Sequence, residues 1–141
     1  MKTKIFLNNK STLDRKTVRR IIRFVLEHLP VMRPLSVRVK DNRTTWVGGH
    51  AEPYSSAVLL TIPKLKRLRL RPYQYAHLKG KFYWLWNRIE MLVYLAAHEI
   101  RHVWQGQFPK AGRYPNGKGK FSEVDTESFA IHILRAWRKT Q

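Results

Sequence analysis

One long segment with a helical apolar repeat, which also carries two histidines, restricts the fold more than any other feature. Over residues 83–105, apolar side chains recur at intervals of three and four, the period of an amphipathic helix. Gly106 follows as a typical helix end. Inside the segment lies the pattern H-E-x-x-H, formed by His98, Glu99 and His102. We therefore expect this helix to be both a core element and the carrier of a site.

The spacing of the two histidines favours metal binding. Residues four apart lie one turn apart on the same helix face, so His98 and His102 can both reach a single Zn²⁺. Glu99 projects from beside the first histidine, where it can act as the general base on a metal-bound water. The chain has no cysteine, so any metal must be held by histidines and carboxylates. The alternative is that both histidines are core residues hydrogen-bonded to their neighbours.

Acidic residues gather downstream of the histidine pair. The chain contains only 9 Asp and Glu against 28 Lys and Arg, yet three of those acids are Glu123, Asp125 and Glu127. On a helix, Glu123 and Glu127 share one face and Asp125 points elsewhere. One glutamate of the pair can bind the metal, and the other can orient a ligand histidine.

The two motifs together resemble the gluzincin metallopeptidases. In that family an HExxH helix is followed by a helix with a glutamate ligand and a second acid four residues later; here 20 residues separate His102 from Glu123. The resemblance implies Glu123 as the third zinc ligand and Glu127 in the place of the supporting acid, where the family commonly has Asp or Asn. It also implies a hydrolase, a zinc metalloprotease in which Glu99 activates the water that cleaves a peptide bond.

Another branch of the zinc peptidases fits less well. Metzincins require HExxHxxGxxH, but Gln105 and Phe108 occupy the positions of the glycine and the third histidine. In folds related to the gluzincins, an edge strand beside the site binds an extended substrate by strand addition. We expect residues 57–62 to be that strand, and a peptide or protein to be the substrate.

The rest of the chain indicates an α+β fold of zincin-like type, with a small sheet packed on the HExxH helix and with N-terminal and C-terminal helices. A length of 141 residues suits one domain, residues 1–141. The first helix starts near Ser11 and Asp14 and ends before Pro30, and the last starts near Ser122. Strands are expected at 35–40, 44–47 and 57–62, in an antiparallel or mixed sheet, with a turn at Gly48-Gly49.

The charge indicates polyanionic partners. A formal net charge of +19 and a sequence pI of about 10.9 attract nucleic acid, ribosomal RNA or an acidic membrane surface. Basic residues interleave with aromatic ones over 64–81, and Arg67, Arg69 and Arg71 alternate there with leucines. This composition suits nucleic-acid binding. The alternative is an exposed edge strand protected from aggregation by its charge.

These features leave competing functions open. The main alternative to a peptidase is a basic nucleic-acid-associated or ribosome-associated protein that retains a zincin-like core without proteolysis, or with regulated proteolysis. A third possibility is a protease recruited to DNA, RNA or ribosomes. The longest apolar run is about seven residues, 91–97, against roughly 20 for a membrane span. We therefore expect a soluble, cytoplasmic protein without a transmembrane segment.

Overall fold

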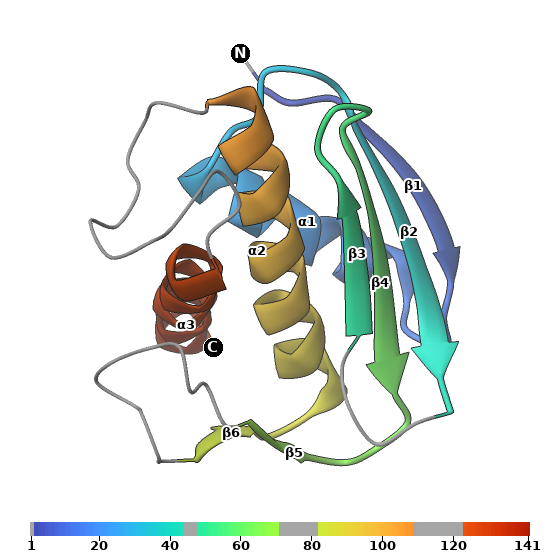
Figure 1. Ribbon diagram of the computed structural model, residues 1–141. Coiled ribbons are helices and arrows are strands. Elements are labelled where there is room, and N and C mark those ends of the chain that lie inside the picture. Colours follow the sequence, from blue (N-terminus) through green and yellow to red (C-terminus); the bar gives the residue numbers. More distant parts are fainter. Residues whose placement is uncertain (1, 44–47, 71–81, 109–122) are drawn as a thin grey trace.

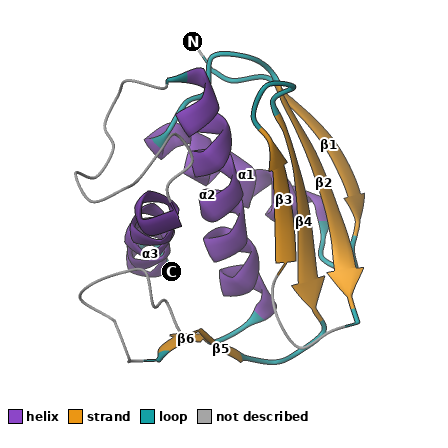
Figure 2. Ribbon diagram, viewed as in Figure 1, coloured by secondary structure: helices purple, strands orange, loops and turns teal. Residues whose placement is uncertain are grey.

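The computed structural model describes residues 2–43, 48–70, 82–108 and 123–141. These residues form a mixed α/β structure with three helices and a small mixed sheet (Figures 1 and 2). One face of the sheet is covered by helices, and the longest helix lies between the sheet and the C-terminal helix. In chain order the elements are β1 (Ile5–Lys10), α1 (Arg15–His28), β2 (Leu35–Asn42), β3 (Gly48–Glu52), β4 (Ala57–Pro63), β5 (Leu68–Leu70), β6 (Tyr83–Leu85), α2 (Arg88–Gln107) and α3 (Glu123–Lys139).

The main sheet has the strand order β1-β2-β4-β3. β1, β2 and β4 are parallel, and β3 pairs antiparallel with β4. The predicted mixed sheet is thus confirmed. However, β4 is an inner strand, so the prediction that residues 57–62 form the edge beside the site is wrong. The edge on that side of the sheet is β3, which includes the two glycines that we expected to form a turn; the predicted strand 44–47 lies outside the described residues.

The strands bury one face of the sheet because their apolar residues alternate. In β2, Leu35, Val37 and Val39 are buried while Ser36 and Arg38 are exposed. In β4 the buried positions alternate in the same way. Such a period of two packs one side of the sheet against the helices and leaves the other to solvent.

The predicted N-terminal, HExxH and C-terminal helices are all present. α1 begins after Asp14, whose side chain accepts a hydrogen bond from Thr17 N, and ends before Pro30 as predicted. α2 begins at Arg88, five residues later than expected, because 83–85 form a strand and Asn87 caps the helix by accepting from Glu90 N (2.9 Å). The buried run 91–97 places α2 at the centre of the core.

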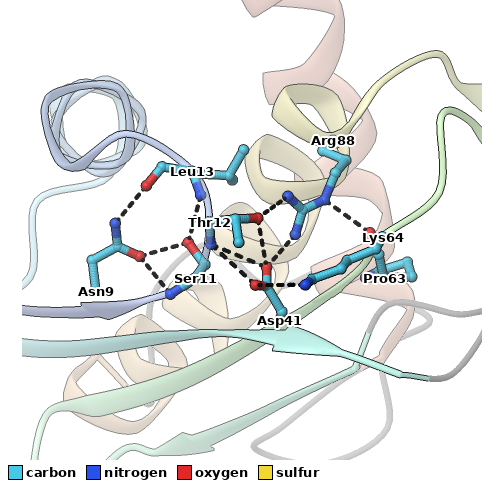
Figure 3. Close-up of polar contacts among 8 residues, drawn as sticks. All are labelled: Asn9, Ser11, Thr12, Leu13, Asp41, Pro63, Lys64 and Arg88. Atoms are coloured by element: carbon cyan, nitrogen blue, oxygen red, sulfur yellow. Dashed lines mark hydrogen bonds and ion pairs between the residues drawn. The ribbon is translucent and has the colours of Figure 1, made fainter.

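A polar cluster fixes the start of α2 against the ends of the strands (Figure 3). Asp41, at the end of β2, accepts hydrogen bonds from Arg88 and from the backbone of Thr12, and it lies 3.7 Å from Lys64 Nζ. Arg88 also donates to the carbonyl of Pro63 (3.0 Å). The first residue of the HExxH helix is therefore tied to β2, to β4 and to the segment between β1 and α1.

A second, two-stranded sheet is formed by β5 and β6, which pair antiparallel below the start of α2 in Figure 1. The strand-like alternation predicted around residues 67–71 is confirmed for β5. Arg69 belongs to β5, Arg67 immediately precedes this strand, and Arg71 lies outside the described residues. Across the described part of the chain, no helix is long and apolar enough to cross a membrane.

Candidate metal centre

The structure brings the three predicted ligands together at the junction of α2 and α3. His98 Nε2 lies 3.2 Å from Glu123 Oε2, and His102 Nε2 lies 2.9 Å from Glu123 Oε1. One ligand atom of each residue lies within 4.8 Å of the others. The helical spacing of four gives the two imidazoles their common direction, and the first residue of α3 supplies the carboxylate. His98, His102 and Glu123 thus form a group that could hold a metal ion.

The negative charge of Glu123 and the positive charge of a protonated His102 stabilise each other. Hydrogen bonds from His102 and His98 hold the pKa of Glu123 far below its usual range. Burial opposes the charged form of His102, but the hydrogen bond and the negative charge of Glu123 outweigh it and raise the pKa of His102. The carboxylate is therefore ionised at neutral pH, the state in which it binds a cation.

The two ring nitrogens of His98 have different surroundings. His98 Nδ1 is buried and has no hydrogen-bond partner within the described residues. Its ring is oriented so that Nε2, and not Nδ1, faces Glu123. Two imidazole Nε2 atoms and one carboxylate that converge on the same point are a common ligand set of catalytic zinc sites.

Glu99 lies beside this group but faces the sheet. Its side chain is buried between α2 and the edge strand β3, and Oε1 is 3.9 Å from His98 Nε2. Burial raises the pKa of Glu99 against the opposing influence of His98 and His102. Gly49 of β3 leaves room for this carboxylate, because a Cβ on Gly49 would stand 3.0 Å from Glu99 Oε1.

An open cleft of about 580 Å³ gives access to the centre. Its floor contains the three ligands and Glu99, and its wall is formed by residues 49–54 of β3 and the following turn. That turn is anchored by Ser56, whose hydroxyl accepts a hydrogen bond from Gln107 Nε2 of α2 (3.1 Å). The edge strand is consequently held in a fixed position next to the site.

A hydrogen-bond network on the Nδ1 side of His102 was not predicted from the sequence. Gln105 Oε1 lies 3.0 Å from His102 Nδ1, and Gln105 Nε2 donates to Asp125 Oδ2 (2.8 Å). Asp125 also accepts two hydrogen bonds from Arg101, at 2.7 and 2.9 Å. With Nδ1 as donor to Gln105, a metal would replace the proton on His102 Nε2 and bind the lone pair of that nitrogen. The sequence signal was the spacing of Arg101 and Gln105, one turn apart on the helix that carries the histidines.

Glu127, predicted to orient a ligand histidine, is buried on α3 one turn after Glu123. Together with burial, the charges of Glu127 and Glu123 raise the pKa of the nearby Tyr94. The proposed contact between Glu127 and a ligand histidine stays a prediction. Four of the nine acids of the chain, Glu99, Glu123, Asp125 and Glu127, therefore gather around this centre.

We compared the chain with models of protein families, with curated proteins and with solved structures, and none of them matches it.

Proposed function

We propose that this chain is a zinc-dependent metallopeptidase of the gluzincin type, built on a zincin-like fold. The observation that carries the proposal is the position of Glu99. A buried carboxylate lies 3.9 Å from His98 Nε2 and opens onto the same cleft as a His-His-Glu group. A structural metal site needs no such unligated acid beside it, whereas a hydrolytic site needs a base within reach of water.

The residues divide into two roles. His98, His102 and Glu123 would hold the metal, and all three line the cleft from which a substrate would approach. When bound, zinc supplies a Lewis acid that lowers the pKa of water and polarises a carbonyl group. Glu99 Oε1 accepts the proton of the attacking water and passes it to the leaving amine as the peptide bond breaks.

The substrate in this proposal is an extended peptide that lies along β3. Within the described residues, β3 pairs only with β4, and residues 49–52 of β3 line the cleft. A peptide added to the other edge of β3 would form main-chain hydrogen bonds and pass over the metal group. β3 thus takes the role that we first assigned to residues 57–62.

Substitution of Glu99 by Gln tests the proposal. The substitution preserves shape and removes the base, so we expect zinc content and thermal stability close to wild type and a loss of about 10²–10⁴-fold in turnover of a cleaved peptide. Glu27→Gln is the matched control, since Glu27 is an exposed acid on α1 and does not line the cleft. This control should cleave at the wild-type rate.

Two results would contradict the proposal. The first is a zinc-loaded wild type that cleaves nothing in a peptide library, which favours the alternative of a non-proteolytic basic protein. The second is a zinc-loaded Glu99→Gln variant that cleaves as fast as the wild type.

A further inference from the structure

The β5–β6 hairpin has two chemically different faces. Strand register places Leu68 opposite Leu85 and Leu70 opposite Tyr83, and these four side chains pack against the core. The opposite face carries Arg69 opposite Trp84. Because side chains alternate along a strand, the flanking residues Arg67, Phe82 and Trp86 share this outer face. We call these five residues, Arg67, Arg69, Phe82, Trp84 and Trp86, the arginine-aromatic face.

The side chains of the arginine-aromatic face are stacked. The Arg69 guanidinium lies 3.8 Å from the centre of the Phe82 ring, and the Arg67 guanidinium lies 5.2 Å from that of Trp84. Trp84 and Trp86 stack on each other with ring centres 5.2 Å apart. Phe82 and Trp86 nevertheless remain 46% and 52% exposed, which is unusual for such large rings.

This stacking leaves ligand-binding groups accessible. A guanidinium that stacks through its flat face keeps the N–H groups at its edge available to an anion. No acid of the described residues forms an ion pair with Arg67 or Arg69. The exposed surfaces of Phe82 and Trp86 can accept a further planar ring. The face therefore offers phosphate donors and stacking surfaces side by side.

The hairpin is also held rigidly. Arg138 of α3 donates hydrogen bonds to the Trp84 carbonyl, to the Tyr83 hydroxyl and to Glu90 of α2. Glu90 in turn accepts from Trp86 N (2.9 Å). Both helices thus fix the backbone that carries the rings, so little conformational entropy is lost when a ligand binds.

We propose that the arginine-aromatic face binds single-stranded nucleic acid, with bases stacked on Phe82 and Trp86 and phosphates bound by Arg67 and Arg69. The occupant follows from the chemistry. Residues 64–70 and 82–86 contain no acid, and the net charge is +19, so the partner is a polyanion. Exposed rings select a strand whose bases are free to stack, which disfavours a duplex. An acidic membrane supplies no such rings.

This second site is separate from the metal centre. His98 is ten positions after Arg88, which lies next to the hairpin, and ten helical residues span roughly 15 Å along α2. Variants of the arginine-aromatic face should therefore keep their zinc content. A result that contradicts nucleic-acid binding would not contradict the proposed peptidase activity, and the converse also holds.

Fluorescence anisotropy with a labelled 20-nucleotide single strand and the matching duplex tests the proposal. We expect tighter binding of the single strand. Arg67→Glu with Arg69→Glu should weaken it at least tenfold and reduce the slope of log affinity against log salt by about 1.4, since each lost phosphate contact removes about 0.7. Phe82→Leu with Trp86→Leu should weaken it about tenfold or more at unchanged charge.

Matched variants separate the site from charge alone. Lys16→Glu with Arg19→Glu on α1 makes the same charge change away from the hairpin and should have a clearly smaller effect. Arg67→Lys with Arg69→Lys keeps the charge and loses the stacked guanidinium, so it should bind at an intermediate level. Equal losses from the α1 and hairpin reversals, equal affinity for duplex and single strand, or binding to phosphatidylserine vesicles but to neither nucleic acid would overturn the proposal.

Discussion

Gly49 of β3 lies directly against the side chain of Glu99 of α2. A Cβ placed on Gly49 would stand 2.8 Å from Glu99 Cγ, closer than such atoms approach in proteins. The edge strand therefore comes near the helix only because it has no side chain at this position. The glycine fixes where the carboxylate can be, and thus where it meets water in the cleft.

Substitution of Gly49 by Ala should separate activity from metal binding. The new methyl group forces the buried Glu99 side chain to shift, so we expect a stability loss of about 1–3 kcal/mol, zinc content as in the wild type and a fall of tenfold or more in peptide cleavage. Gly106→Ala, within α2, is the control and should leave cleavage unchanged. Full activity of Gly49→Ala would mean that the position of Glu99 is not critical.

Metal removal should lower the melting temperature. The ligands come from two helices, so the folded chain binds the ion and the unfolded chain does not. Zinc at a free concentration 100 times its Kd stabilises by about 2.7 kcal/mol, roughly 5–10 °C for a chain of this size. Differential scanning calorimetry with zinc and with a chelator measures this shift. It should vanish in Glu123→Ala and be only reduced in Glu127→Ala; the reverse order would exchange the roles of these two residues.

Gln105 should act as a positioning residue for the metal. Gln105→Met removes the amide between His102 Nδ1 and Asp125 but leaves the Arg101–Asp125 pair in place. We expect a 10–100-fold loss of zinc affinity in competition titrations with a chelating dye. Gln107→Met on the same helix is the control, because that amide binds Met32 N and Ser56 instead. A similar loss of affinity in both variants would argue against the positioning role.

The Asp41 cluster should make stability depend on pH. Burial disfavours the Asp41 carboxylate, but the hydrogen bonds from Arg88 and Thr12 and the charges of Arg88 and Lys64 outweigh it and lower the pKa of Asp41. A lowered pKa stabilises the fold above the unfolded value of about 4, and this stabilisation is lost as pH falls through the folded value.

Urea unfolding at a series of pH values tests this expectation. At pH 6, Asp41→Asn should unfold with about 1–3 kcal/mol less free energy than the wild type, and the difference should shrink below pH 4. Glu27→Gln, an exposed acid on α1, serves as the surface control. A difference that stays constant from pH 6 to pH 3 would show that the Asp41 charge is not responsible.

The helices could be predicted because their periodic apolar faces are long. The sheet was harder to predict, since β1 has only Ile5 and Leu7 as alternating apolar residues and pairs with β2 across the intervening helix α1. β3 was missed because Gly48-Gly49 is a common turn signal. Here Gly49 belongs to a strand, and the reason is its contact with Glu99, a residue 50 positions away that no local pattern reveals.

Within the site, helix periodicity could predict which side chains lie together only when they belong to the same helix. The spacing of four aligned His98 and His102, and the structure brings Glu123 next to both. Asp125 was expected to point away from the centre because it lies off the face of Glu123. It does point elsewhere, but toward Arg101 and Gln105 of the neighbouring helix. Its role depends on how α2 and α3 pack, which the sequence pattern does not specify.

Four acids around the metal centre are surrounded by a chain of net charge +19, and this arrangement has a kinetic consequence. A free divalent cation in solution is repelled by the protein as a whole and attracted only near the cleft, within about 10 Å at 0.1 M salt. Added salt screens the repulsion, so ion uptake should be faster at higher ionic strength, whereas capture of an oligonucleotide should become slower. An ion delivered as a negatively charged complex would avoid the barrier, and the carrier of the metal could thus determine how quickly the site fills.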